Sequence, residues 1–157
     1  MGTAFESTAE RLGPRRGGTA RRILVGVDGS DTAMRAAAFA FGAARREGGG
    51  LVVVYVACHS ALAAFGPAIA SAAEHEAAAC LGEELREQVR AAAEELDVPV
   101  TFIRTHGDPC TALREAADDH QADMVVVGAS QSAGHRFAGS VATKLIRTGH
   151  WPVLVVP

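Results

Sequence analysis

The chain has 157 residues, a length typical of one domain with its own hydrophobic core. Its formal net charge of −3 is too small to direct it to nucleic acid or a membrane surface, although arginines gather between Arg11 and Arg22. Apolar residues make up 48% of the chain and aromatic residues only 5%. Aliphatic side chains must therefore build the core, which favours an α/β fold.

Three scattered cysteines, Cys58, Cys80 and Cys110, show no C-x-x-C spacing. Their odd number and spacing argue against a disulfide framework or a zinc site and are typical of a reducing compartment. No apolar run reaches the roughly 18 residues of a membrane span, and no apolar segment of a secretory signal opens the chain. We expect a cytoplasmic protein.

The first elements follow a polar segment. Residues 1–20 are rich in Gly and Arg, and we expect a flexible tail there, ahead of an α/β domain over residues 21–157. Arg22 to Asp28 reads as a buried strand. Ser30 or Asp31 can cap the helix that follows.

That helix ends at the glycines 48–50, and residues 51–57 form a second strand, apolar on both faces. Residues 59–70 show little pattern and read as a loop or short helix. Apolar residues then recur every three to four positions over 72–96, which predicts a long amphipathic helix. Residues 98–104 form the third strand.

The last third of the chain repeats the alternation. Pro109 suits the first turn of a helix, and residues 122–128 predict a fourth strand. A last helix is expected from Gly139 to about Thr148, and a fifth strand over residues 151–156.

Every connection between strands is long enough for a helical crossover. Consecutive strands must then be parallel, with helices on both faces of the sheet. Ligands bind to such sheets outside the carboxyl ends of the strands, where the strand order reverses. The expected site therefore comprises residues 27–30, residues 56–58 and the segment that starts at Gly128.

The segment from Val125 to Val141 runs from a strand through a glycine-punctuated loop into a helix. Small residues and free N–H groups at the helix start, with Ser140 as a hydroxyl donor, favour a phosphate site. Gly134 and Gly139 have the spacing of a Walker A loop, but Ser140 stands where the lysine should follow. Alternatively, these glycines only turn the chain and Ser140 caps the helix.

Several motifs, in this order and spacing, resemble the universal stress protein family over Arg21 to Val156. They are I-L-V-G-V-D-G-S, V-V-V-Y-V, H-G-D-P, V-V-V-G-A-S and G-S-V followed by W-P-V-L-V-V-P. The resemblance implies an open α/β sandwich of five parallel strands in the order 3-2-1-4-5. One branch of the family binds ATP through a G-x2-G-x9-G-S/T loop, and another lacks both the loop and the nucleotide.

The loop of this chain falls between the two branches. Gly128 matches the first glycine and Gly139 with Ser140 the closing pair, but Gln131 holds the second glycine position and the loop is two residues shorter. Gly134 can take over the role of the missing glycine.

The resemblance also assigns the adenosine end of the site. Asp28 matches an aspartate near the base and ribose, and Val56 a backbone position against adenine. It thus implies ATP with Mg²⁺ as ligand. The nucleotide-binding residues that we expect are Val27, Asp28, Val56, Val127, Gly128, Ser130, Gly134, Gly139, Ser140 and Val141.

The residues alone leave other interpretations open. Asp28 can simply accept a hydrogen bond from the turn that follows its strand. The six histidines lack metal-binding spacing, and no catalytic motif is present, so we expect neither a metal site on the protein nor an enzyme.

Three functions remain to be compared. The first is a dimeric, nucleotide-dependent switch of the stress response. The second is a module of the same fold that no longer binds nucleotide and acts through protein partners. A nucleotide hydrolase or adenylate-transfer enzyme is disfavoured by the missing lysine. The apolar C-terminal strand invites pairing with another chain, and the resemblance implies a homodimer through it.

Overall fold

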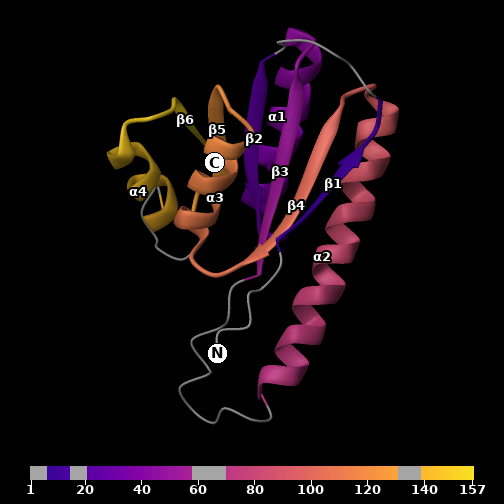
Figure 1. The fold of residues 1–157 in the computed structure, drawn as a ribbon, viewed down its shortest axis with the longest axis vertical. Coiled ribbons are helices and arrows are strands. Elements are labelled where there is room, and N and C mark those ends of the chain that lie inside the picture. The colour runs from indigo at the N-terminus through magenta and orange to yellow at the C-terminus, as the bar shows by residue number, and fades with distance from the viewer. Residues whose placement is uncertain (1–6, 15–20, 58–69, 131–138) are drawn as a thin grey trace.

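The structure, a computed structural model, describes residues 7–14, 21–57, 70–130 and 139–157 and contains one sheet flanked by helices (Figure 1). In chain order the elements are β1 (Thr8–Leu12), β2 (Arg22–Val27), α1 (Asp31–Glu47), β3 (Gly50–Ala57), α2 (Ala70–Glu95), β4 (Val100–His106), α3 (Pro109–Asp119), β5 (Met124–Gly128), α4 (Ser140–Thr148) and β6 (Val153–Val156). Of the segment 59–70, predicted as a loop or short helix, residues 59–69 lie outside the described residues.

The sheet has the strand order β1-β4-β3-β2-β5-β6. The five strands from β2 to β6 are mutually parallel, and their order is the predicted 3-2-1-4-5. The chain proceeds from β2 to β3 on one side and returns to β5 on the other side of β2. The strand order therefore reverses at β2, where a ligand cleft is expected.

A sixth strand corrects the prediction of five. β1 pairs antiparallel with β4, from Thr8 opposite Arg104 to Leu12 opposite Val100. Its first four residues are exposed, and only Leu12 is buried. Residues 8–12 show no apolar alternation, because a single side chain anchors this strand to the core.

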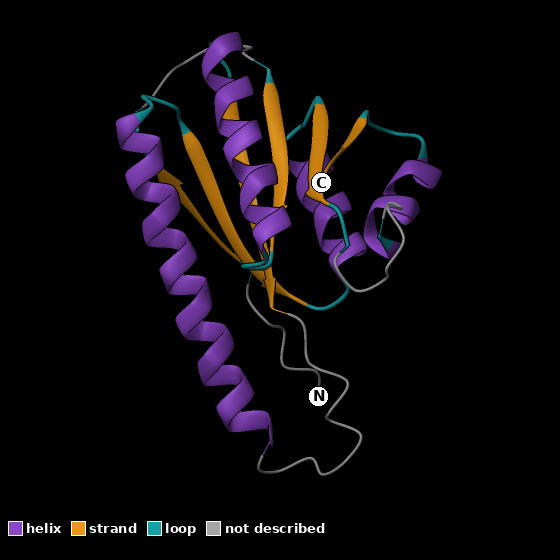
Figure 2. Cartoon of the chain, turned by 180° about the vertical axis from the view of Figure 1, so that it is seen from behind, coloured by secondary structure: helices purple, strands orange, loops and turns teal. Residues whose placement is uncertain are grey.

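Alternation of side chains along the strands divides the core into two layers. One layer packs under α1 and α2 and includes Val25, Val53 and Phe102. The other packs under α3 and α4 and includes Leu24, Val54 and Val125. Figure 2 shows α1 and α2 side by side across one face of the sheet. Helices therefore cover both faces, as predicted for a parallel sheet.

The ends of α1 follow from local chemistry. Ser30 is the N-cap residue, and its side chain accepts a hydrogen bond from the backbone of Ala33. Gly48 ends the helix in the left-handed region with φ of 62°. Across the described part of the chain, no helix has both the length and the apolarity of a membrane span.

Candidate functional site

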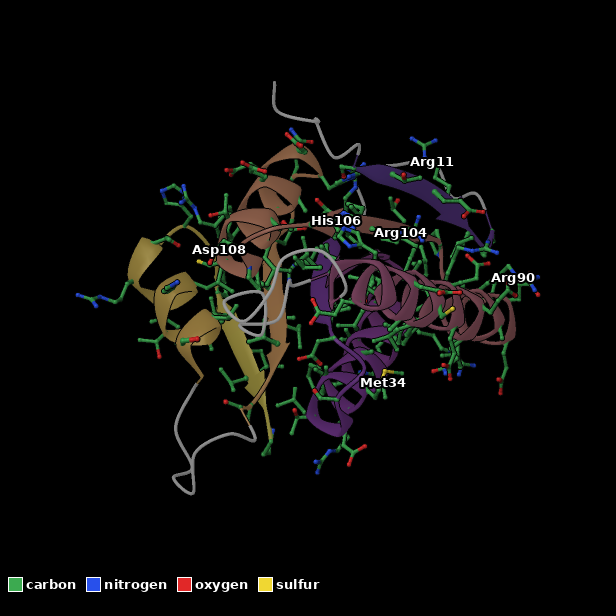
Figure 3. All side chains as sticks on the ribbon, turned by 90° about the horizontal axis from the view of Figure 1, so that it is seen from below. Arg11, Met34, Arg90, Arg104, His106 and Asp108 are labelled. Carbon is green, nitrogen blue, oxygen red and sulfur yellow. The ribbon has the colours of Figure 1, made fainter. Side chains whose placement is uncertain are left out.

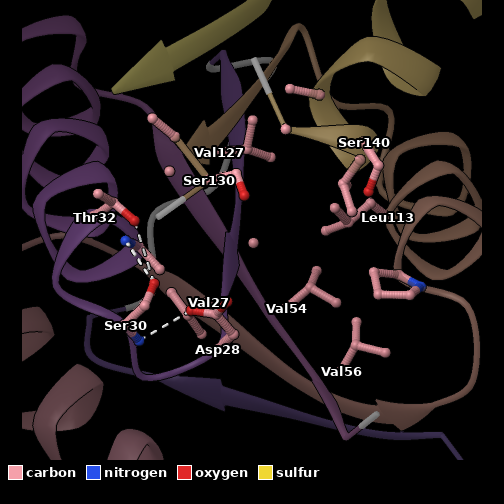
Figure 4. Close-up of a pocket in the computed structure, with 18 residues that line it drawn as sticks. Val27, Asp28, Ser30, Thr32, Val54, Val56, Leu113, Val127, Ser130 and Ser140 are labelled. Atoms are coloured by element: carbon pink, nitrogen blue, oxygen red, sulfur yellow. Dashed lines mark hydrogen bonds between the residues drawn. The ribbon is translucent and has the colours of Figure 1, made fainter. Parts of the chain in front are cut away.

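A cleft of about 360 Å³ opens at the carboxyl ends of β2, β3 and β5, beside the start of α4 (Figure 4). Its volume lies within the range of small-molecule sites. The described residues that line it are Gly26, Val27, Asp28, Ser30, Thr32, Ala33, Val54, Val56, Pro109, Leu113, Val127, Gly128, Ala129, Ser130, Gly139, Ser140, Val141 and Ala142.

Nine of the ten expected site residues line this cleft; the tenth, Gly134, lies outside the described residues. Sequence reasoning missed Gly26, Val54, Leu113 and Pro109 in particular. Val54 could have been found from strand alternation, because it lies two residues before Val56 on the same face. Leu113 enters from α3 and carries no motif, so only the packing reveals it.

The turn between β2 and α1 positions Asp28. The backbone nitrogen of Ser30 donates to Oδ1 of Asp28 at 2.9 Å, which fixes the carboxylate in the turn. Gly29 makes the turn possible with φ of 82°. Asp28 is exposed and lines the cleft, so the expected turn contact and a ligand contact through Oδ2 are compatible.

The exit of β5 runs very close to α1. A Cβ atom at Gly128 would lie 2.6 Å from the backbone nitrogen of Ala33 and 2.6 Å from the carbonyl carbon of Thr32. Glycine is therefore required here by helix–strand packing, independently of any ligand.

The start of α4 differs from the alternative in which Ser140 caps the helix. Gly139 is the N-cap residue and Ser140 the first helical residue, and Gly139 has no side chain with which to cap the helix. The first turn of a helix offers N–H groups without intrahelical partners and the positive end of the helix dipole. Ser140 and Val141 line the cleft, so this end of α4 faces a site that suits an anion.

The floor of the cleft is apolar. Val54, Val56 and Leu113 line it, and Leu113 lies where a side chain at Gly26 would otherwise be, with Cδ2 3.1 Å from the position of a Cβ atom. Such a floor suits a flat aromatic group, with the polar groups of the cleft at its sides.

Charge is sparse among the described residues that line the cleft. Among its described lining residues, Asp28 carries the one charged side chain; the other polar side chains are the hydroxyls of Ser30, Thr32, Ser130 and Ser140. Within the described ranges, no group of three or more His, Cys, Asp or Glu side chains could hold a metal ion. A divalent cation would therefore depend on oxygens that the ligand brings.

A pair of opposite charges, Asp108 and Lys144, lies where α3 meets α4. Asp108 caps α3 and accepts hydrogen bonds at Oδ2 from the backbone nitrogen and Oγ1 of Thr111, at 2.9 and 3.0 Å. These bonds, with a smaller effect of Lys144, hold the pKa of Asp108 below its ordinary value. Nζ of Lys144 lies 3.6 Å from Oδ1 of Asp108.

Other expected features lie away from the cleft or outside the description. Cys110 is buried and Cys80 is exposed, while Cys58 lies outside the described residues. β6 forms one edge of the sheet, and its four residues are all half-buried.

Comparison of the sequence with known proteins gives one consistent result. The model of the universal stress protein family matches residues 19–157. A universal stress protein of Methanocaldococcus jannaschii is 30% identical over 144 residues, which cover 87% of this chain and 81% of that protein. One from Thermus aquaticus is 34% identical over 142 residues, which cover 87% of this chain and 98% of that protein.

Solved structures share the fold. Universal stress protein UspA of Lactobacillus plantarum superposes with a TM-score of 0.71 at 24% identity, over 90% of this chain and all of that one. A universal stress protein in complex with cAMP gives 0.63 at 24% identity, over 89% and 99%. One from Archaeoglobus fulgidus in complex with dAMP gives 0.60 at 22% identity, over 87% and 98%.

Proposed function

Because the chain belongs to the universal stress protein family, we propose that it is a stress-response regulatory protein that binds an adenine nucleotide in the cleft between β2, β3, β5 and α4. The base lies on the apolar floor and a phosphate lies at the start of α4. Asp28 accepts hydrogen bonds from the ribose.

One observation carries this proposal: the cleft joins an apolar floor to the start of a helix whose N-cap residue, Gly139, has no side chain to cap it. A flat apolar group linked to an anion needs both features within one site. Solved universal stress proteins in complex with cAMP and with dAMP support an adenine nucleotide as the ligand.

The finer proposal is ATP with Mg²⁺. Mg²⁺ is usually bound through one or two carboxylates together with substrate phosphates, and it often keeps several waters. Asp28 is the one carboxylate among the described lining residues; Ser30 engages its Oδ1, and the proposal assigns its Oδ2 to the ribose. The ion would therefore enter with the nucleotide and be held by phosphate oxygens and water.

We infer binding rather than turnover. Among the described lining residues, the hydroxyls and the single carboxylate of Asp28 include no nucleophile beside a histidine or lysine base. A ligand that stays intact can shift the population of two conformations, as a switch requires. The proposed switch is a homodimer, with the β6 edge as the pairing surface.

The experiment is a calorimetric titration of the protein with AMP, ADP and ATP, with and without Mg²⁺. Asp28→Asn keeps an oxygen that can accept from Ser30 but removes the charge, and we expect roughly a tenfold loss of affinity or more, the effect of a lost charged hydrogen bond. Asp31→Asn is the matched control, because Asp31 is an exposed acid in the first turn of α1 outside the cleft. Absence of heat with all three nucleotides would contradict the proposal.

The packing of the two glycines favours a second candidate function. Gly128 is required by α1, and a Cβ atom at Gly139 would lie 2.8 Å from Cβ of Ser130. Both glycines are thus explained without a phosphate. The second candidate is a module that acts through a protein partner, and absence of heat with AMP, ADP and ATP would favour it.

A further inference from the structure

We propose that the ammonium group of Lys144, beside the cleft, changes partner when a nucleotide binds. It pairs with Asp108 in the free protein and binds the outer phosphates in the complex, and so favours ATP over AMP. The inference rests on the proposed nucleotide site and adds to it a residue that sets selectivity by phosphate number. Neither Lys144 nor Asp108 belongs to the expected binding residues.

Lys144 and Asp108 belong to elements whose first residues line the cleft. Lys144 lies one helical turn after Ser140 on α4, and Ser140 lines the cleft. Asp108 immediately precedes Pro109, which lines the cleft from the start of α3. The pair of Lys144 and Asp108 therefore joins the two helices beside the site, and Figure 3 shows Asp108 where α3 and α4 meet.

The two partners are held very differently. Oδ2 of Asp108 accepts two hydrogen bonds from Thr111, which fix the carboxylate as the cap of α3. Lys144 reaches Oδ1 at 3.6 Å, longer than an ordinary N–H···O hydrogen bond. The side chains of Lys144 and Asp108 are 61% and 50% exposed, so water screens their attraction. Lys144 is thus the partner that can leave.

A nucleotide with two or three phosphates would attract Lys144 away from Asp108. The described residues that line the cleft include the carboxylate of Asp28 and no cationic side chain. The start of α4 can neutralise part of one phosphate, because the helix end carries about half a positive charge. A diphosphate or triphosphate adds negative charge that this helix end does not balance. Lysine is a flexible point charge that commonly binds phosphate.

The test measures the affinities for AMP and ATP in four proteins: wild type, Lys144→Met, Asp108→Asn and the double variant. Asparagine is as good a helix cap as aspartate, so Asp108→Asn removes the charge while keeping α3 capped. We expect Lys144→Met to weaken the affinity for ATP roughly tenfold, the effect of losing a charged hydrogen bond, and to leave the affinity for AMP nearly unchanged. Asp108→Asn should tighten ATP binding, and this gain should disappear in the double variant.

Arg147→Met is the matched control, because Arg147 is exposed in the last turn of α4 and its loss removes the same charge from the same helix. An unchanged ratio of ATP to AMP affinity in Lys144→Met would overturn the inference while AMP binding upheld the nucleotide site. An equal gain from Asp108→Asn with and without Lys144 would also overturn it. Failure of the wild type to bind any nucleotide would instead remove the proposed function, and this inference with it.

Discussion

The backbone nitrogen of Ala33 lies 2.6 Å from the point that a Cβ atom at Gly128 would occupy. The end of β5 and the first turn of α1 thus touch backbone to backbone, and this contact forms one wall of the cleft. Neither backbone can retreat easily, because Val127 and Ala33 on the two sides of the contact are buried. The geometry of the site therefore depends on the absence of a side chain at Gly128.

We therefore expect Gly128→Ala to lower the free energy of unfolding by about 1–3 kcal/mol, the usual cost of forcing an extra carbon into a packed region. Urea unfolding followed by circular dichroism measures it. Gly50→Ala is the control: its added Cβ would meet nothing closer than the carbonyl oxygen of Pro99 at 3.6 Å, an ordinary contact. Equal stability of the Gly128 and Gly50 variants would contradict the close approach.

A second close contact permits a rescue experiment. A Cβ atom at Gly139 would lie 2.8 Å from Cβ of Ser130, which brings the two described ends of the β5–α4 loop together. Gly139→Ala should therefore destabilise the protein. Ser130→Gly removes the opposing carbon, so the double variant should lose less stability than the sum of the two single changes. Additive losses measured by urea unfolding would show that the two positions are not in contact.

Much of the fold could be predicted because parallel strands buried on both faces read as apolar runs, as in Leu51 to Ala57. The cleft followed from the same topology together with the family motifs. β1 could not be predicted, because one buried side chain, Leu12, produces no periodicity. Leu113 and the contact of Lys144 with Asp108 depend on how α3 and α4 pack, which no local pattern encodes.

The attachment of β1 provides a third prediction. Leu12 is 5% exposed, whereas the other four residues of β1 are exposed. Leu12→Ala should remove this anchor. If β1 stays paired with β4, the change should lower the free energy of unfolding by about 2–5 kcal/mol. Detachment of β1 limits that cost and exposes the edge of β4, so we expect faster amide hydrogen exchange at residues 100–104. Ala9→Ser, at an exposed position of β1, is the control and should leave exchange in β4 unchanged.

His120, at the end of α3, makes stability depend on pH. Burial, with smaller effects of Arg22 and Arg11, lowers its pKa below the ordinary 6.5, although Asp119 opposes the shift. The unfolded chain then binds the proton more tightly, so the stabilisation is complete above pH 6.5 and is lost as the pH falls through the folded pKa. Urea midpoints between about pH 5 and 8 should therefore fall more steeply on acidification in the wild type than in His120→Gln. Parallel profiles for the two proteins would contradict this account.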